Sequence, residues 1–168
     1  MLVGHSYGAF LSELFAATHS EIVKGIILLD PNNIAFVDAI GGPDAVKRDP
    51  LTAPPYDRSR PDLLTKDQRA ELRVFDGIDN LAATMRSVEI PKTIPVRVIT
   101  AGRPWWPMLE RNQAWRASHE RLAASVTDGR LIVAERSGHR IDRDQPDLVV
   151  TTVSDLIQQV RTNRASGR

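Results

Sequence analysis

The feature that most limits the fold of this chain is the alternation of short apolar runs with stretches of helical periodicity. Three runs are rich in β-branched and other apolar residues: KGIILLD at 24–30, IPVRVITAG at 94–102 and GRLIVAE at 129–135. Apolar residues recur at helical spacing between and after them, for example over 9–19. Strands that alternate with helices predict an α/β fold, in which helices pack on a mostly parallel sheet.

The run at 24–30 is apolar at successive positions and stops at Asp30-Pro31. Such a run predicts a strand that is buried on both faces, in the centre of the sheet. Residues 1–3 are interpreted as the end of a preceding strand, and the connection to 24–30 is long enough for a helical crossover. A last helix is predicted over about 145–160, with Asp144 as its N-cap.

Residues 32–92 differ in composition from the rest of the chain. Prolines and glycines cluster in GGPDAVKRDPLTAPPYDRSRPD, and Thr65 to Gln68 then has the form of a capping box that starts a helix. We predict that 32–92 is a cap or lid of short helices. The core of the fold is then expected over 1–31 and 93–162, and 163–168 is expected to be a disordered tail.

Composition excludes several classes of function. The 168 residues carry a net charge of +1, which favours neither nucleic acid nor an anionic membrane as a partner. The absence of cysteine excludes disulfides, thiolate catalysis and cysteine-based metal sites. We find no nucleotide, flavin or metal signature, no membrane-spanning run and no leader before MLVGHS, so we expect a cytoplasmic protein without cofactors or metals.

The residues that carry chemistry follow the predicted strands. Ser6 follows the first strand, Asp30 ends the second, and His139 lies in the loop after the last. A serine hydroxyl needs a general base to become a nucleophile, and the base needs an acid to orient it. Because the carboxyl ends of parallel strands meet at one edge of a sheet, we expect these three side chains to converge.

The stretch GHSYG places a glycine two positions either side of Ser6, between a strand and a helix. This context predicts a sharp turn with a strained serine, in which a side chain at Gly4 or Gly8 would clash. The turn also directs the backbone N–H of Tyr7 toward a developing oxyanion, which makes Tyr7 the candidate oxyanion-hole residue.

Two segments resemble the α/β-hydrolase superfamily. GHSYGA resembles its nucleophile elbow, and ERSGHRIDRDQPDLVV resembles its catalytic-histidine loop. The resemblance covers nearly the whole chain. It implies strands five to eight of an eight-stranded, mostly parallel sheet with a helical cap, and it implies Ser6 as the nucleophile and His139 as the base.

The acid has two candidates. The family usually takes it from the turn after strand seven, here AGRPWWPMLERNQ, where the only carboxylate is Glu110. Some members place the acid at the end of strand six, where Asp30 stands. We favour Asp30, with Glu110 or the absence of an intact acid as alternatives, because geometry has to be satisfied before pKa.

These observations favour a serine hydrolase that acts on an ester, or a related carbonyl bond, of a small and mostly apolar molecule. The resemblance implies that four strands precede the elbow, so we expect a truncated chain with impaired activity. Its open strand edge would favour association into homo-oligomers. The alternative is a non-catalytic remnant or interaction module.

Other aromatic side chains have more ordinary interpretations. His5 is expected to pack or to form local hydrogen bonds, and His19 and His119 are expected on helix surfaces. Trp105 and Trp106 either line an apolar substrate site or pack the cap against the sheet.

Overall fold

The computed structural model describes residues 1–165. The chain divides into two compact units. The first combines Met1–Asn33 with the chain from Val88 onward, and the second is Ile34–Ser87. All the elements that carry the predicted chemistry belong to the first unit.

Four parallel strands form one sheet in the order β1-β2-β3-β4. They are β1 (Leu2–His5), β2 (Ile26–Leu29), β3 (Val96–Ala101) and β4 (Gly129–Ala134). The α/β class with a parallel sheet is therefore confirmed. Because each strand runs in the same direction, the loops that follow them leave from one edge, which is the edge where ligands bind in such sheets.

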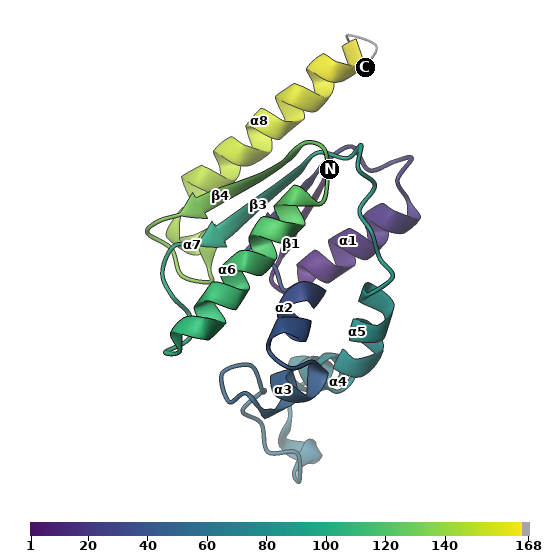
Figure 1. The fold of residues 1–168 in the computed structure, drawn as a ribbon. Coiled ribbons are helices and arrows are strands. Elements are labelled where there is room, and N and C mark those ends of the chain that lie inside the picture. The colour runs from purple at the N-terminus through teal and green to yellow at the C-terminus, as the bar shows by residue number, and fades with distance from the viewer. Residues whose placement is uncertain (166–168) are drawn as a thin grey trace. The chain divides into compact units, whose positions relative to one another are not determined.

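Helices cover both faces of this sheet (Figure 1). On one face lie α1 (Gly8–Thr18) and α6 (Leu109–Ala124), and on the other lie α7 (Ile141–Asp144) and α8 (Pro146–Ala165). The four residues of β2 are all buried and alternate between two apolar clusters, as a strand with period two requires. The first cluster contains Ile26 and Leu28 with Ala9, Ala16, Val96, Val98 and Ala123, and the second contains Ile27 and Leu29 with Ile99, Ile141 and Leu156.

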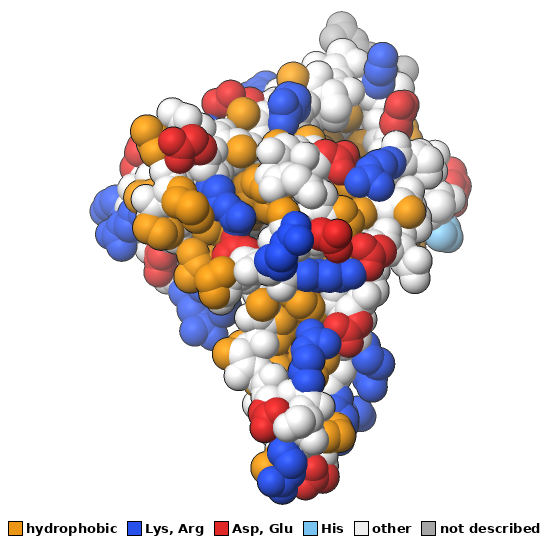
Figure 2. All heavy atoms as spheres, turned by 60° about the horizontal axis from the view of Figure 1, so that its bottom comes forward, with side chains coloured by type: hydrophobic (Ala, Val, Ile, Leu, Met, Phe, Trp, Pro, Cys, Tyr) orange, Lys and Arg blue, Asp and Glu red, His pale blue; other side chains and the backbone are white. Residues whose placement is uncertain are grey.

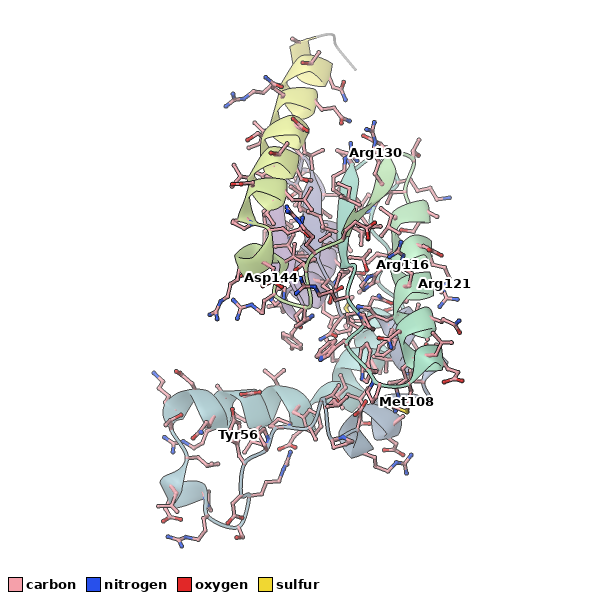
Figure 3. The ribbon with its side chains drawn as sticks, turned by 90° about the vertical axis from the view of Figure 1, so that its left-hand side faces the viewer. Tyr56, Met108, Arg116, Arg121, Arg130 and Asp144 are labelled. Atoms are coloured by element: carbon pink, nitrogen blue, oxygen red, sulfur yellow. The ribbon has the colours of Figure 1, made fainter. Side chains whose placement is uncertain are left out.

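The second unit consists of short helices: α2 (Ile34–Ala39), α3 (Pro43–Arg48), η1 (Pro61–Leu63), α4 (Lys66–Asp76) and α5 (Ile78–Met85). The capping box predicted from the sequence is present at the start of α4. Thr65 accepts a hydrogen bond from the Gln68 backbone N–H at 3.2 Å, and Gln68 Oε1 accepts one from the Thr65 N–H at 2.8 Å. Tyr56, labelled in Figure 3, donates a hydrogen bond to Glu71 on α4 at 2.7 Å.

The last helix, α8, starts within one residue of its predicted start, but its C-terminal end and its predicted N-cap differ from the prediction. It continues to Ala165, so residues 163–165 of the predicted tail are helical, and 166–168 lie outside the described residues. Asp144 is not its N-cap. Asp144 lies in α7, and its carboxylate accepts hydrogen bonds from the Ser137 hydroxyl at 3.1 Å and the Gly138 N–H at 3.0 Å. This carboxylate therefore holds the preceding loop (Figure 3).

Acidic and basic side chains are interspersed on the face shown in Figure 2, without a large area of one sign. This distribution agrees with the net charge of +1. Over residues 1–165, no helix combines the length and the apolar character that crossing a bilayer requires.

Candidate active site

Ser6 stands in a strained turn between β1 and α1. Its φ is 52°, in the left-handed region that L-residues rarely adopt, as the glycine spacing predicts. A Cβ on Gly4 would lie 2.6 Å from the Gly8 carbonyl oxygen, so Gly4 is required for the close approach of strand and helix. The predicted clash at Gly8 is wrong, because a Cβ there meets no heavy atom of the described chain within 4 Å.

The turn leaves a backbone donor free beside the serine. Tyr7 is the N-cap of α1, where N–H groups have no intrahelical partner. Among the described residues, the Tyr7 N–H makes no backbone hydrogen bond. The N-terminus of α1 has a positive electrostatic potential, and the Tyr7 N–H can donate a hydrogen bond there. Both would stabilise negative charge that develops beside Ser6.

Asp30 ends β2 and is completely buried. Its φ of 40° is also in the left-handed region, which L-residues rarely adopt. Oδ1 accepts hydrogen bonds from the Ala101 N–H at 2.9 Å and from the Trp115 indole N–H at 3.0 Å. Oδ2 lies 2.8 Å from Nδ1 of His139.

Burial alone would raise the pKa of Asp30, because it disfavours the charged form. Hydrogen bonds from His139, the Ala101 N–H and Trp115 outweigh burial and hold the pKa of Asp30 below its usual value. Asp30 is therefore ionised at neutral pH. A carboxylate can only accept a hydrogen bond. Nδ1 of His139 therefore carries the proton and donates a hydrogen bond to Asp30.

The loop that carries His139 is fixed from two sides. Asp144 binds its start, as described above, and the Nε2–H of His5 donates to the His139 carbonyl oxygen at 2.8 Å. The sequence predicts packing or a local hydrogen bond for His5, whereas this hydrogen bond reaches a residue 134 positions away in the sequence. The His139 ring stacks on Trp105, with centroids 4.2 Å apart and planes inclined by 19°. Trp105 therefore presents an aromatic surface to the imidazole.

Among the described residues, the Ser6 hydroxyl makes no direct hydrogen bond with the His139 ring, and the two are linked through His5. The ring of His5, next to Ser6, lies 4.6 Å from the His139 ring between centroids. Ser6 Oγ instead accepts a long hydrogen bond of 3.4 Å from the Asn32 side chain. Catalytic hydrogen bonds are often long or unformed without substrate.

Asn32 is a contact that sequence reasoning missed. Its backbone N–H also donates to the Ser6 carbonyl oxygen at 3.1 Å, so it binds the serine turn twice. The only signal in the sequence is its position, two residues beyond the predicted acid.

The alternative acid, Glu110, lies on the surface of the first turn of α6, and none of its described interactions reaches His139. His19 is exposed, as expected. The expected surface position of His119 is wrong, because its side chain is fully buried against the end of β2 and β3. In residues 1–165, no cluster of three or more His, Cys, Asp or Glu side chains is placed to hold a metal ion.

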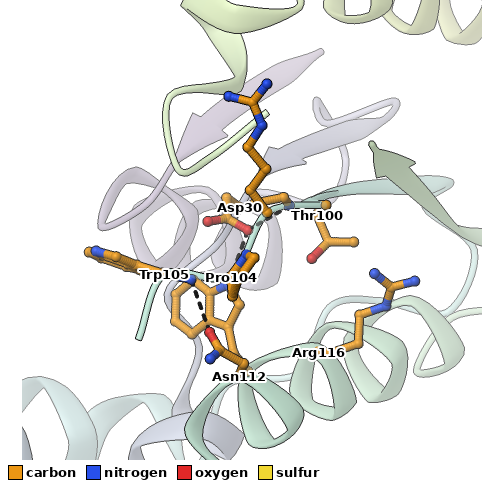
Figure 4. A pocket seen from close by; sticks show the side chains of 10 residues that line it. Asp30, Thr100, Pro104, Trp105, Asn112 and Arg116 are labelled. Carbon is orange, nitrogen blue, oxygen red and sulfur yellow. Dashed lines mark hydrogen bonds between the residues drawn. The ribbon is translucent and has the colours of Figure 1, made fainter. Parts of the chain in front are cut away.

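A cavity of about 140 Å³ lies behind the acid, between the loop after β3 and α6. Figure 4 shows Asp30 and Thr100 on one side of it and Asn112 and Arg116 on α6 on the other. The Asn112 Oδ1 accepts hydrogen bonds from the N–H groups of Trp105 and Trp106, both at 3.0 Å. The cavity is smaller than the roughly 300–1,000 Å³ of a drug-sized ligand site, so it is interpreted as the packing around the carboxylate.

A strained serine after one parallel strand, and a histidine loop after another, define the architecture of the α/β hydrolases. A family model described as "Alpha/beta hydrolase family" matches residues 1–152. The chain belongs to this family. No curated protein matches it.

Solved structures show the same fold at low sequence identity. An alpha/beta hydrolase fold protein from Burkholderia ambifaria superposes with a TM-score of 0.54 and 21% identity, over 91% of this chain and 64% of its own. The wild-type protein DBJA gives a TM-score of 0.54, 16% identity, and coverage of 96% and 69%. A variant of the meta-cleavage product hydrolase CumD gives 0.51, 19%, and coverage of 94% and 64%. The chain thus spans about two thirds of the length of these relatives.

Proposed function

We propose that this chain carries the catalytic groups of a serine hydrolase acting on an ester, or a related carbonyl bond, of a small and mostly apolar molecule. The observation that carries the proposal is the 2.8 Å hydrogen bond between His139 Nδ1 and Asp30, in a loop that His5 ties to the Ser6 turn. Membership of the alpha/beta hydrolase family supports hydrolysis as the class of reaction.

The proposed reaction starts with attack of Ser6 Oγ on the substrate carbonyl carbon. In the neutral form of His139, the proton on Nδ1 is donated in the hydrogen bond to Asp30, and the lone pair on Nε2 takes the serine proton. The Tyr7 N–H stabilises the resulting oxyanion. His139 then gives its proton to the leaving alcohol, which leaves an acyl-serine. Water, deprotonated by His139, attacks this acyl group, and the proton returns to Ser6 as the acid product leaves.

The proposal also covers the substrate, the cellular location and the partners of the chain. The aromatic plane of Trp105, stacked on His139, supports an apolar acyl or alcohol group beside the imidazole. We propose a cytoplasmic protein whose partner is a small-molecule substrate, without a cofactor, nucleic acid or membrane partner. We also propose association of copies through the outer edge of β1.

Turnover of p-nitrophenyl acetate by the purified chain tests the proposal. Ser6→Ala and His139→Ala should each lower the rate by about 10⁴- to 10⁶-fold, or to the uncatalysed background. Ser20→Ala, which alters an exposed serine, serves as the matched control and should hydrolyse the ester like the parent. Equal rates for Ser6→Ala and the parent would reject Ser6 as the nucleophile.

A second candidate is an interaction module without turnover. Two observations favour it: Ser6 Oγ bonds to Asn32 instead of His139, and β1 lies at the edge of the described sheet with Val3 half exposed. An open strand edge can pair with another chain. A stable complex of defined stoichiometry, combined with no ester turnover, would support this candidate over the first.

A further inference from the structure

One face of α6 is buried and polar. Trp115, Ser118 and His119 are spaced i, i+3 and i+4, so they lie on the same side of the helix. Ser118 and His119 are 0% exposed and Trp115 is 5% exposed. A helix normally buries apolar side chains, because a buried polar group is costly unless it is hydrogen-bonded. The partners of this face therefore explain its composition.

Each of the three side chains binds a different residue of the segment 30–33, which we call the acid turn. Trp115 donates its indole N–H to the Asp30 carboxylate at 3.0 Å. His119 Nε2 lies 2.8 Å from the Pro31 carbonyl oxygen. These two contacts hold the acid and the residue that follows it.

The third contact extends along the same turn. The Asn33 side chain donates to Ser118 Oγ at 2.9 Å, and Ser118 in turn donates to the Trp115 carbonyl oxygen at 2.7 Å. Between the residues that α6 holds lies Asn32, which binds both the hydroxyl and the carbonyl of Ser6. The acid turn therefore connects α6 with the serine turn and with His139.

The hydrogen bonds also fix which ring nitrogen of His119 carries the proton. A carbonyl can only accept, so Nε2–H donates to Pro31. Burial lowers the pKa of His119 and keeps the ring neutral, so Nδ1 accepts from the Thr100 hydroxyl at 2.8 Å. The N–H of Ala101, the residue after Thr100, donates to Asp30. His119 thus connects the acid turn with the end of β3, and the same end of β3 donates the Ala101 N–H to the Asp30 carboxylate.

We propose that Trp115 and His119 are positioning residues: they hold the acid turn, with Asp30 in its left-handed conformation, and so keep the Asp30 carboxylate against His139. Both side chains are buried, at 5% and 0% exposure. The catalytic meaning of this inference rests on the proposed function, while the effect on the Asp30–His139 hydrogen bond does not.

Four variants separate positioning from packing. Trp115→Phe removes the indole donor and keeps an aromatic ring. His119→Leu removes both ring hydrogen bonds, and His119→Gln restores an N–H for the Pro31 carbonyl. Glu120→Gln changes an exposed side chain of the same helix and is the control.

Two readouts are measured on each folded variant, with folding checked by circular dichroism. The first is the downfield proton resonance of the His139 Nδ1–H, assigned by its absence from His139→Gln. The second is the rate of covalent labelling by a fluorophosphonate, which yields a maximal rate and a half-saturating concentration.

We expect Trp115→Phe and His119→Leu to lose or broaden the resonance and to lower the maximal labelling rate about tenfold to a hundredfold, with half-saturation unchanged. His119→Gln should recover most of both signals, and Glu120→Gln should match the parent. A folded Trp115→Phe that keeps resonance and rate overturns the inference, even if His119→Leu does not fold. If the parent is not labelled but Trp115→Phe loses the resonance, the proposed function fails and the positioning role stands.

Discussion

Glu13 allows a quantitative test of the way α1 packs. It lies on the same face of α1 as Ala9 and Ala16, which are fully buried, and is itself 6% exposed. Its Oε1 has no hydrogen-bond partner in the described chain. Burial raises the pKa of Glu13 from 4.5 to about 8, because nothing compensates the desolvation of the carboxylate.

The raised pKa makes folding depend on pH in a definite direction. Between pH 4.5 and about 8 the folded chain keeps the Glu13 proton while the unfolded chain has lost it, so the unfolded state binds fewer protons. Stability from this group is therefore present at low pH and is lost as pH rises to about 8. A difference of about 3.5 pH units, at 1.36 kcal/mol each, corresponds to about 5 kcal/mol of unfolding free energy.

We expect Glu13→Gln to remove this dependence. The variant should gain stability relative to the parent by roughly 1.4 kcal/mol per pH unit between pH 5 and 8, and the gain should level off above pH 8. Urea unfolding followed by circular dichroism at each pH measures it. Glu21→Gln, at an exposed carboxylate, should follow the parent. Parallel stability curves for Glu13→Gln and the parent would refute the reasoning.

The remaining predictions concern the turns and the acid. Gly4→Ala should destabilise the chain by about 2 kcal/mol or more, since its Cβ would lie 2.6 Å from a backbone oxygen, whereas Gly8→Ala should be nearly neutral; urea unfolding compares them. Thr65→Ala should lower the free energy of unfolding by about 1 kcal/mol through loss of the capping box, measured in the same way. An unchanged free energy would show that the cap does not stabilise the chain. Asp30→Asn should lower ester turnover about 10⁴-fold by removing the carboxylate that orients His139, and activity equal to the parent would exclude Asp30 as the acid.

The sheet was predictable because its strands are short, apolar and buried. The pattern of 24–30 reappears as β2, whose side chains alternate between the two faces of the sheet. The strained serine also follows from local sequence, since Gly4 and the strand–helix context specify it. These features depend on neighbours a few residues apart.

The hydrogen bonds that Trp115 and His119 make to Asp30 and Pro31 could not be predicted, because they join residues that are distant in the sequence. Trp115 and His119 bind residues 85 and 88 positions away. Helical periodicity predicts that a helix face is buried when its residues are apolar. A buried face made of polar residues is therefore predicted to be exposed. The buried carboxylate of Glu13 escaped prediction for the same reason, since charged residues are rarely buried without a partner.

The most direct test of the central claim is to identify the residue that a fluorophosphonate modifies in the folded chain. Peptide mapping by mass spectrometry after labelling locates the bond. The account predicts one modified peptide, containing Ser6, with labelling abolished in Ser6→Ala and strongly slowed in His139→Gln. A folded chain whose Ser6 remains unmodified, or whose labelling is indifferent to His139, would contradict it.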